Sequence, residues 1–154
     1  DRGPDQTQAH GTGVGGGGRM MRPVAILALC VGLTACDSNS RPARSFSDPA
    51  VQKLYSLPVP DYAGTARLAQ QIAQSCPRYR FDSGLYSKVN EKRNKEGRGS
   101  TAAKTQSGGV DVMTSVLTRE FQSDYGVTVG QSDVCAAADQ ESAKNTALAA
   151  FGWC

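Results

Sequence analysis

The sequence predicts an all-α protein, built as a small bundle of three to four helices. Apolar residues from residue 62 to the C-terminal end of the sequence recur three and four positions apart, the spacing that places side chains on one face of a helix. Prolines and glycine-rich stretches separate these segments and mark where helices end. Three cysteines in the same region predict one intramolecular disulfide that holds the bundle together.

The N-terminal part of the chain is expected to stand apart from the bundle. Residues 1–19 are polar and glycine-rich, so we expect a disordered leader that precedes the candidate start residues Met20 and Met21. Residues 20–35 follow the order of a secretory signal peptide: a positive start, an apolar run of ten residues and then small residues. The run is too short to cross a bilayer core, which takes about 20 apolar residues.

Leu33-Thr34-Ala35-Cys36 closes this segment. These residues resemble the lipobox of bacterial lipoprotein precursors, in which a leucine and two small residues precede a cysteine. The resemblance implies that the Cys36 sulfur carries a diacylglycerol, that the chain is cut before Cys36, and that the protein stays on the periplasmic face of a membrane in the cell envelope. Two or three acyl chains on one residue are enough for a lasting anchor. Asp37 resembles the enterobacterial signal for retention in the inner membrane, which favours that membrane.

Residues 36–60 are expected to form a tether, with the helical domain at residues 61–154. The first half of the tether is polar and lacks periodicity. Pro49 fits the first position of a single helical turn. Leu54 and Tyr55 leave two interpretations open: they pack on the domain as a staple, which we favour, or they belong to a partner-binding segment.

The first helix of the domain is expected over residues 62–76. Asp61 is its candidate N-cap, because the carboxylate can accept hydrogen bonds from the free N–H groups of the first turn. Leu68 and Ile72 define one apolar face. Pro77 ends the helix, since the residue before a proline is driven out of the α region.

A second helix is expected over residues 78–97, with an apolar stripe that includes Tyr79, Phe81 and Leu85. Gly84 weakens this helix by up to about 1 kcal/mol relative to alanine. Residues 97–109 are rich in glycine and are expected to form a loop.

Residues 110–125 show the clearest helical pattern, and Gly126 suits the left-handed position beyond the helix end. The predicted core face consists of Val110, Met113, Val116, Leu117 and Phe121. A last helix is expected over residues 134–151, capped by Ser132 or Asp133. Its predicted buried side consists of Val134, Ala138, Ala143, Ala147, Leu148 and Phe151.

The chain has five cysteines. Cys30 leaves with the signal peptide and Cys36 takes lipid, which leaves Cys76, Cys135 and Cys154 in an oxidising compartment. Three thiols allow one disulfide and one free cysteine. We favour a disulfide between Cys76 and Cys135, because antiparallel packing would bring the end of the first helix to the start of the last; Cys76 with Cys154 is the alternative.

Positive charge is concentrated between Arg78 and Lys104, where eight basic residues stand against three acidic residues. We favour a solvated helix end and loop, and the alternative is contact with anionic lipid headgroups or another acidic surface near the anchor. The candidate contact residues are Lys88, Lys92, Arg93, Lys95 and Arg98. Nucleic acid is not expected as a partner, because the protein is predicted outside the cytoplasm.

The only histidine, His10, lies in the leader. A mature chain that starts at Cys36 would contain none, which removes Ser-His-Asp and Cys-His catalysis and most catalytic zinc sites, since each needs imidazole. No Cys-x-x-Cys sequence supports a redox motif or a zinc ribbon. We therefore expect no metal and no cofactor apart from the covalent lipid on Cys36.

Cys76, the Tyr125-Gly126 turn and Cys135-Ala136-Ala137 form a second pattern: a helix that ends in cysteine, a turn, and a later helix that opens with Cys-Ala-Ala. In this pattern, residues 68–148 resemble a group of small secreted proteobacterial helical proteins of unknown function. The resemblance implies a helical fold and names no activity.

Three function classes remain. The favoured class is a membrane-tethered periplasmic lipoprotein that acts as a non-catalytic interaction or accessory module for an unidentified envelope protein. The second is an envelope structural lipoprotein that binds anionic lipid or peptidoglycan through residues 78–104. The third is a carboxylate-based enzyme, for which Glu120 and Asp124, one helical turn apart, form the only close pair on a well-predicted helix. We favour the simpler interpretation that both carboxylates face water.

Overall fold

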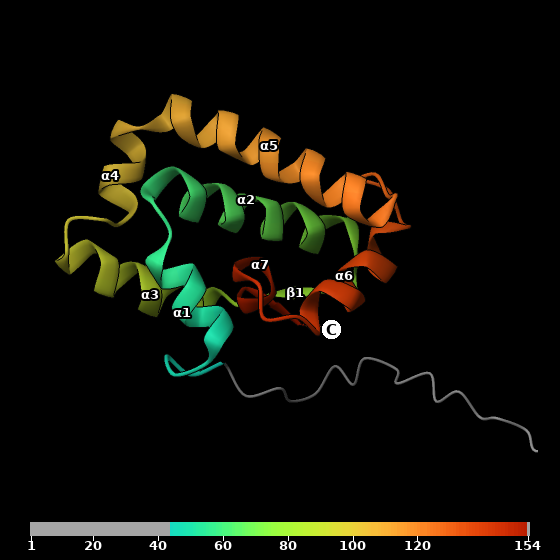
Figure 1. Cartoon of the computed structure of the whole chain (residues 1–154), viewed down its shortest axis with the longest axis horizontal. Coiled ribbons are helices and arrows are strands. Elements are labelled where there is room, and N and C mark those ends of the chain that lie inside the picture. Colours follow the sequence, from blue (N-terminus) through green and yellow to red (C-terminus); the bar gives the residue numbers. More distant parts are fainter. Residues whose placement is uncertain (1–43, 154) are drawn as a thin grey trace, which may run out of the picture. The chain divides into compact units, whose positions relative to one another are not determined.

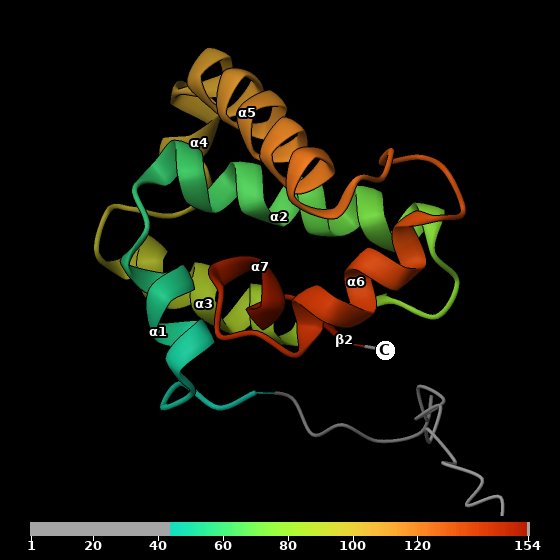
Figure 2. The same ribbon diagram turned by 45° about the vertical axis from the view of Figure 1, so that its right-hand side comes forward.

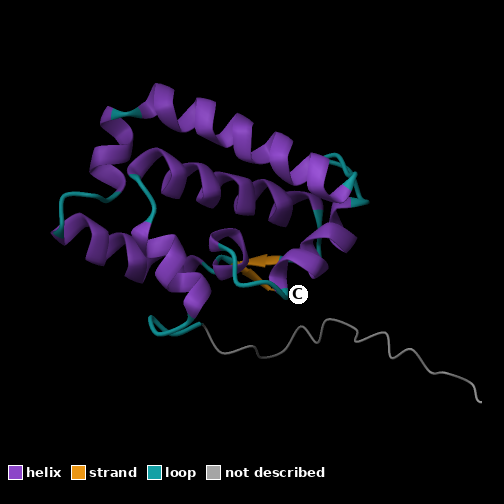
Figure 3. Ribbon diagram, in the orientation of Figure 1, coloured by secondary structure: helices purple, strands orange, loops and turns teal. Residues whose placement is uncertain are grey.

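Helices dominate the computed structural model, which describes residues 44–153 (Figure 1). The fold class predicted from the sequence is confirmed. The helices are α1 (Pro49–Ser56), α2 (Val59–Ser75), α3 (Ser83–Lys95), α4 (Ser100–Thr105), α5 (Ser107–Tyr125), α6 (Val134–Ser142) and α7 (Ala147–Ala150). The strands among these residues are short: β1 (Arg80–Phe81) pairs antiparallel with β2 (Gly152–Trp153), so that Phe81 lies opposite Gly152 (Figure 3).

The two longest helices, α2 and α5, lie side by side in both views of the domain (Figures 1 and 2). Gly64 of α2 lies at their contact, where an added Cβ would stand 3.2 Å from Met113 Cγ and 3.2 Å from the backbone nitrogen of Thr114. The absence of a side chain at Gly64 therefore lets the two helices approach closely. The N–H of Val127 bonds to the Gln122 carbonyl at 3.2 Å beyond the end of α5, and Gly126 takes the predicted left-handed conformation with φ 63°.

One part of the core joins α1, α2, α3 and the C-terminal segment. Val51 and Leu54 of α1 are fully buried in it together with Phe151. The Tyr62 and Tyr86 rings are stacked with their centroids 6.1 Å apart. The helical turn predicted at Pro49 is therefore a full helix, and its burial places residues 49–56 of the predicted tether within the packed domain.

The other part of the core lies around the far ends of α2 and α5. Phe121, Ile72 and Val134 are buried there beside Cys76. Cys76 follows the last residue of α2 and forms a disulfide with Cys135 in the first turn of α6, with an S–S distance of 2.06 Å. The favoured cysteine pairing is confirmed.

Two helix starts differ from the sequence prediction. α2 begins at Val59, so Asp61 lies inside its first turn and is not the N-cap; a proline in the first turn is compatible with a helix, because the N–H it lacks has no helical partner there. The second helix begins only at Ser83, where the Asp82 carboxylate accepts a hydrogen bond from the Leu85 N–H at 2.7 Å. Phe81 lies before it in β1 and packs on Phe151 at 5.4 Å between ring centroids.

Two further segments differ. The predicted loop over residues 97–109 contains α4 and the first residues of α5. The last helix is not continuous: α6 ends at Ser142, and a second N-cap at Thr146 starts α7, with the Thr146 hydroxyl accepting from the Ala149 N–H at 3.1 Å. Ala143 is consequently exposed, and the buried face of α5 includes Thr114 while Val116 remains 49% exposed.

The predicted leader, signal peptide and lipidation site at Cys36 lie outside the described residues, as does Cys154. No helix within residues 44–153 combines the length and the apolar character that crossing a membrane requires.

Candidate functional site

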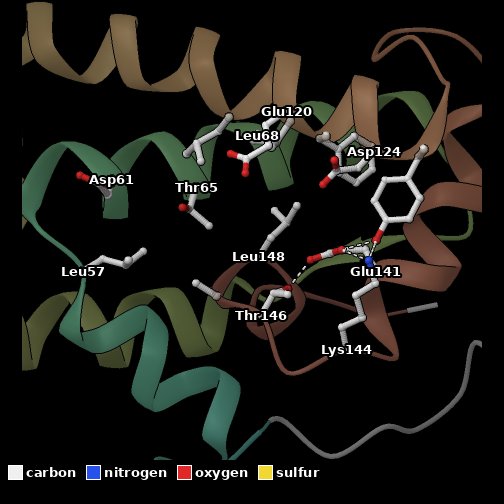
Figure 4. A pocket seen from close by; sticks show the side chains of 14 residues that line it. Leu57, Asp61, Thr65, Leu68, Glu120, Asp124, Glu141, Lys144, Thr146 and Leu148 are labelled. Carbon is white, nitrogen blue, oxygen red and sulfur yellow. Dashed lines mark hydrogen bonds and ion pairs between the residues drawn. The ribbon is translucent and has the colours of Figure 1, made fainter.

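A pocket of ≈ 270 Å³ lies between α2, α5 and the segment that joins α6 to α7 (Figure 4). Its walls are largely aliphatic and aromatic. α2 contributes Leu68, α5 contributes Leu117 and Phe121, and Leu148 enters from α7. Leu57, from the short connection between α1 and α2, also belongs to this apolar lining.

Acidic side chains surround the apolar lining. Asp61 lies in the first turn of α2, and Glu120 and Asp124 lie one turn apart on α5. Figure 4 shows the two α5 carboxylates directed from their helix toward Leu148 and Glu141 on the opposite side. None of these three carboxylates takes part in an ion pair within residues 44–153. The pocket therefore carries an excess of negative charge.

The fourth carboxylate of the pocket, Glu141, belongs to a satisfied network. It is 7% exposed, accepts hydrogen bonds from the hydroxyls of Tyr125 and Thr146, and lies 3.5 Å from the Lys144 ammonium. Burial, reinforced by the hydrogen bond to Glu141, raises the pKa of Tyr125, so its hydroxyl remains a donor. The hydrogen bond that Lys144 donates to Tyr125 raises the pKa of Lys144 and keeps it cationic. This network fixes the α6–α7 connection, and with it one wall of the pocket.

Thr65 lies on the same face of α2 as Asp61 and lines the pocket. The residue is only 4% exposed, and its hydroxyl has no hydrogen-bond partner among the described residues. The Thr65 hydroxyl therefore offers an open acceptor and donor position inside the pocket.

The candidate carboxylate pair from the sequence lies at this pocket. Glu120 and Asp124 are exposed to solvent, as the simpler interpretation expects, and they also border the cavity. The helical spacing was sufficient to place these two residues on one side of α5. It gave no indication of Asp61, Thr65 or Glu141, because these residues come from other helices and meet α5 only through tertiary packing.

The predicted anionic-surface residues divide into two kinds. Lys88 and Lys95 are exposed on α3, and Lys95 pairs with Glu91 at 2.9 Å. Lys92 lies 4.6 Å from the centre of the Tyr55 ring, and Arg98 pairs with Glu96 at 2.8 Å. Four of the five side chains can therefore reach solvent, but two of these four are paired with acidic neighbours.

Arg93 is the exception, because it is fully buried and cannot contact an external surface. Its guanidinium donates to the carbonyl of Tyr55 at 2.5 Å and to that of Arg98 at 3.1 Å, and lies 4.3 Å from the centre of the Tyr62 ring. Burial lowers the pKa of Arg93, although an arginine stays protonated at physiological pH. The sequence does contain an indication that Arg93 is buried, because it follows Val89 by four residues and Leu85 by eight and so lies on the buried face of α3.

No family model, curated protein or solved structure matches the chain. Within residues 44–153, no group of three or more histidine, cysteine or acidic side chains is arranged to hold a metal ion. The lining residues themselves indicate what the pocket could bind: the leucines can cover an aliphatic group, and the carboxylates can bind an organic cation.

Proposed function

We propose that this protein is a lipoprotein of the bacterial cell envelope, held on the periplasmic face of a membrane by lipid on Cys36, and that its domain is a non-catalytic interaction module. The residues Leu33-Thr34-Ala35-Cys36 support the lipid anchor. The disulfide between Cys76 and Cys135 supports an oxidising compartment, because disulfides are rare in the cytosol.

The observation that carries the interaction role is the open pocket with its uncompensated carboxylates. A concave, largely apolar site with a few convergent polar groups is the usual form of a binding site. Asp61, Glu120 and Asp124 gain little from one another, since like charges repel, and each would gain from a cationic group brought by a partner. The anchor holds this pocket in the envelope, where such a partner is met.

Site-specific crosslinking in intact cells tests this role. A photo-reactive amino acid replaces Ala143, which is exposed and next to Lys144 at the pocket, and a matched control carries it at Ser87 on the exposed face of α3. We expect a defined protein adduct from position 143 that is absent from position 87 and is lost when Glu120→Gln and Asp124→Asn are combined. Adducts that are identical at both positions, or that persist in the double variant, would contradict an interaction through the pocket.

A second function is favoured by one contact. Lys92 lies 5.1 Å from the centre of the Phe46 ring, and Phe46 follows Cys36 by ten residues, a stretch that spans at most about 35 Å. The exposed lysines of α3 thus lie within reach of an anchored bilayer, which favours contact with anionic lipid or with peptidoglycan. In this case Lys88→Gln with Lys95→Gln would reduce binding to anionic vesicles or sacculi and weaken its salt dependence, whereas Arg93 must be left intact because it is buried.

A further inference from the structure

The size and lining of the pocket limit what can occupy it. The cavity of ≈ 270 Å³ is slightly below the range of about 300–1,000 Å³ that is usual for pockets that enclose small-molecule ligands. Leu57, Leu68 and Leu148 line it from three different segments. One long amino-acid side chain therefore fits within the cavity, and the leucines can cover an aliphatic part of it.

The charge of the lining gives the sign of the occupant. Lys144 is the cation that the lining contributes, and it is already paired with Glu141. Asp61, Glu120 and Asp124 remain without an ion-pair partner in the part of the chain that the structure describes. An occupant that neutralises them carries positive charge.

The Thr65 hydroxyl adds a second, independent indication. Thr65 is 4% exposed as a residue and lines the pocket, its hydroxyl has no hydrogen-bond partner among residues 44–153, and Figure 4 shows it between Asp61 and Leu68 along α2. A hydroxyl oxygen accepts a hydrogen bond from a cationic N–H as a carboxylate does. A donor that enters this pocket can therefore bond to Thr65 as well as to the acidic side chains.

The distribution of these acceptors distinguishes between the two basic side chains. A guanidinium is a planar fork that binds best to one carboxylate through two parallel hydrogen bonds. An ammonium has three donors arranged around a compact charge, on a four-carbon stem that packs on apolar surface. The pocket has a hydrogen-bond acceptor on α2, Thr65, and carboxylates on α5, with leucine side chains in the same lining. This arrangement fits an ammonium on an aliphatic stem better than a guanidinium, which prefers one carboxylate.

We infer that the pocket binds the side chain of a lysine presented by a partner protein. The stem lies against Leu57, Leu68 and Leu148, and the ammonium bonds to Thr65 and to one carboxylate of α5, Glu120 or Asp124. The inference rests on the proposed interaction module and names the chemistry that this module recognises in its partner.

Titration of the full chain in a non-ionic detergent tests the inference, with ligand binding followed by NMR. The probes are the blocked amides Nα-acetyl-lysine N-methylamide, its arginine counterpart and its norleucine counterpart, which lacks the ammonium. We expect the lysine amide to bind at least about tenfold more tightly than the norleucine amide, because the charge contributes most of the affinity. The arginine amide should be intermediate.

Matched variants locate the binding. Glu120→Gln and Asp124→Asn should each weaken lysine-amide binding about fivefold, the upper end for a partly exposed ion pair. Thr65→Val keeps the shape of the side chain, removes the hydroxyl, and should weaken binding about threefold. Glu91→Gln removes the same charge on α3, away from the pocket, and should leave the affinity unchanged.

The inference would be overturned if the lysine and norleucine amides bound equally, or if all three pocket variants kept the wild-type affinity. It would also be overturned if 1,5-diaminopentane bound more than about tenfold tighter than the lysine amide, because that result would identify a free diamine as the occupant. These results are independent of the crosslinking at position 143. If the adduct forms but the amides do not bind, lysine recognition is refuted and the interaction module stands.

Discussion

Reduction of the disulfide between Cys76 and Cys135 should remove a large share of the domain's stability. The bond closes a loop with a sequence separation of 59 residues, and restricting the unfolded chain over such a loop is worth about 4 kcal/mol in the chain-entropy model. The free energy of unfolding of a single domain is typically about 5–15 kcal/mol. A domain this rich in alanine, with short helices such as α6 and α7, depends strongly on this contribution.

Urea unfolding followed by far-ultraviolet circular dichroism measures the effect. If unfolding loses about 1.5 kcal/mol of free energy per molar urea, reduction should lower the unfolding midpoint by about 2–3 M. The control is the double variant Cys76→Ala and Cys135→Ala, in which the same reductant should leave the midpoint unchanged. A shift below about 0.5 M on reduction of the wild type would show instead that packing alone holds α6 against α2.

Three further predictions concern the core. Burial raises the pKa of Tyr62, so the stability from its neutral hydroxyl is complete below pH 10 and is lost as pH rises above it, at about 1.4 kcal/mol per pH unit. Tyr62→Phe also removes a buried hydroxyl that has no partner among the described residues. In urea titrations, the free energy of unfolding of this variant should equal or exceed that of the wild type at pH 7 and should fall less between pH 10 and 11. Parallel pH profiles of the two proteins would contradict this expectation. Arg93→Met leaves two carbonyls without their donor and should lower the free energy of unfolding by about 2 kcal/mol, and Arg93→Lys should lower it by at least half of that. The exposed control Lys95→Met should lower it by less than about 0.5 kcal/mol. Equal effects at positions 93 and 95 would show that the hydrogen bonds of the buried Arg93 do not stabilise the domain. In Gly152→Ala, the new Cβ would stand 1.8 Å from the Tyr79 hydroxyl oxygen, so thermal unfolding should show a loss of about 2 kcal/mol in the free energy of unfolding. The control Gly108→Ala, with no atom within 4 Å of the new Cβ, should be neutral or stabilising. Equal melting temperatures for the two variants would contradict the close packing of Gly152 on Tyr79.

The features that could be predicted from the sequence are local ones. Leucine and isoleucine at helical spacing predicted α2, and the glycine after Tyr125 predicted the end of α5. Cys76 and Cys135 follow and open helices, so packing of their apolar faces was enough to predict the disulfide. In the two helices, the residues that determine the feature lie within a few positions of it, and the disulfide could be predicted because both cysteines stand at helix ends.

The features that were missed depend on tertiary contacts. The break between α6 and α7 is stabilised by Glu141, which accepts from the Thr146 hydroxyl, and alanine-rich spacing on both sides conceals it. β1 forms because residues 80–81 find a partner strand more than 70 residues later in the chain. The pocket is the clearest case, since Asp61 and Glu141 converge from helices 80 positions apart. Such convergence has no periodicity along the chain that could indicate it.

Labelling with palmitate tests directly whether lipid on the sulfur of Cys36 holds this domain in the envelope. Cells that make either the wild-type chain or its Cys36→Ser variant are grown with radiolabelled palmitate, and their membrane and soluble fractions are separated. The wild-type protein should carry label and sediment with the membranes, and the variant should be unlabelled and be released from them. An unlabelled wild-type protein that fractionates in the same way as the variant would show that Cys36 carries no lipid anchor.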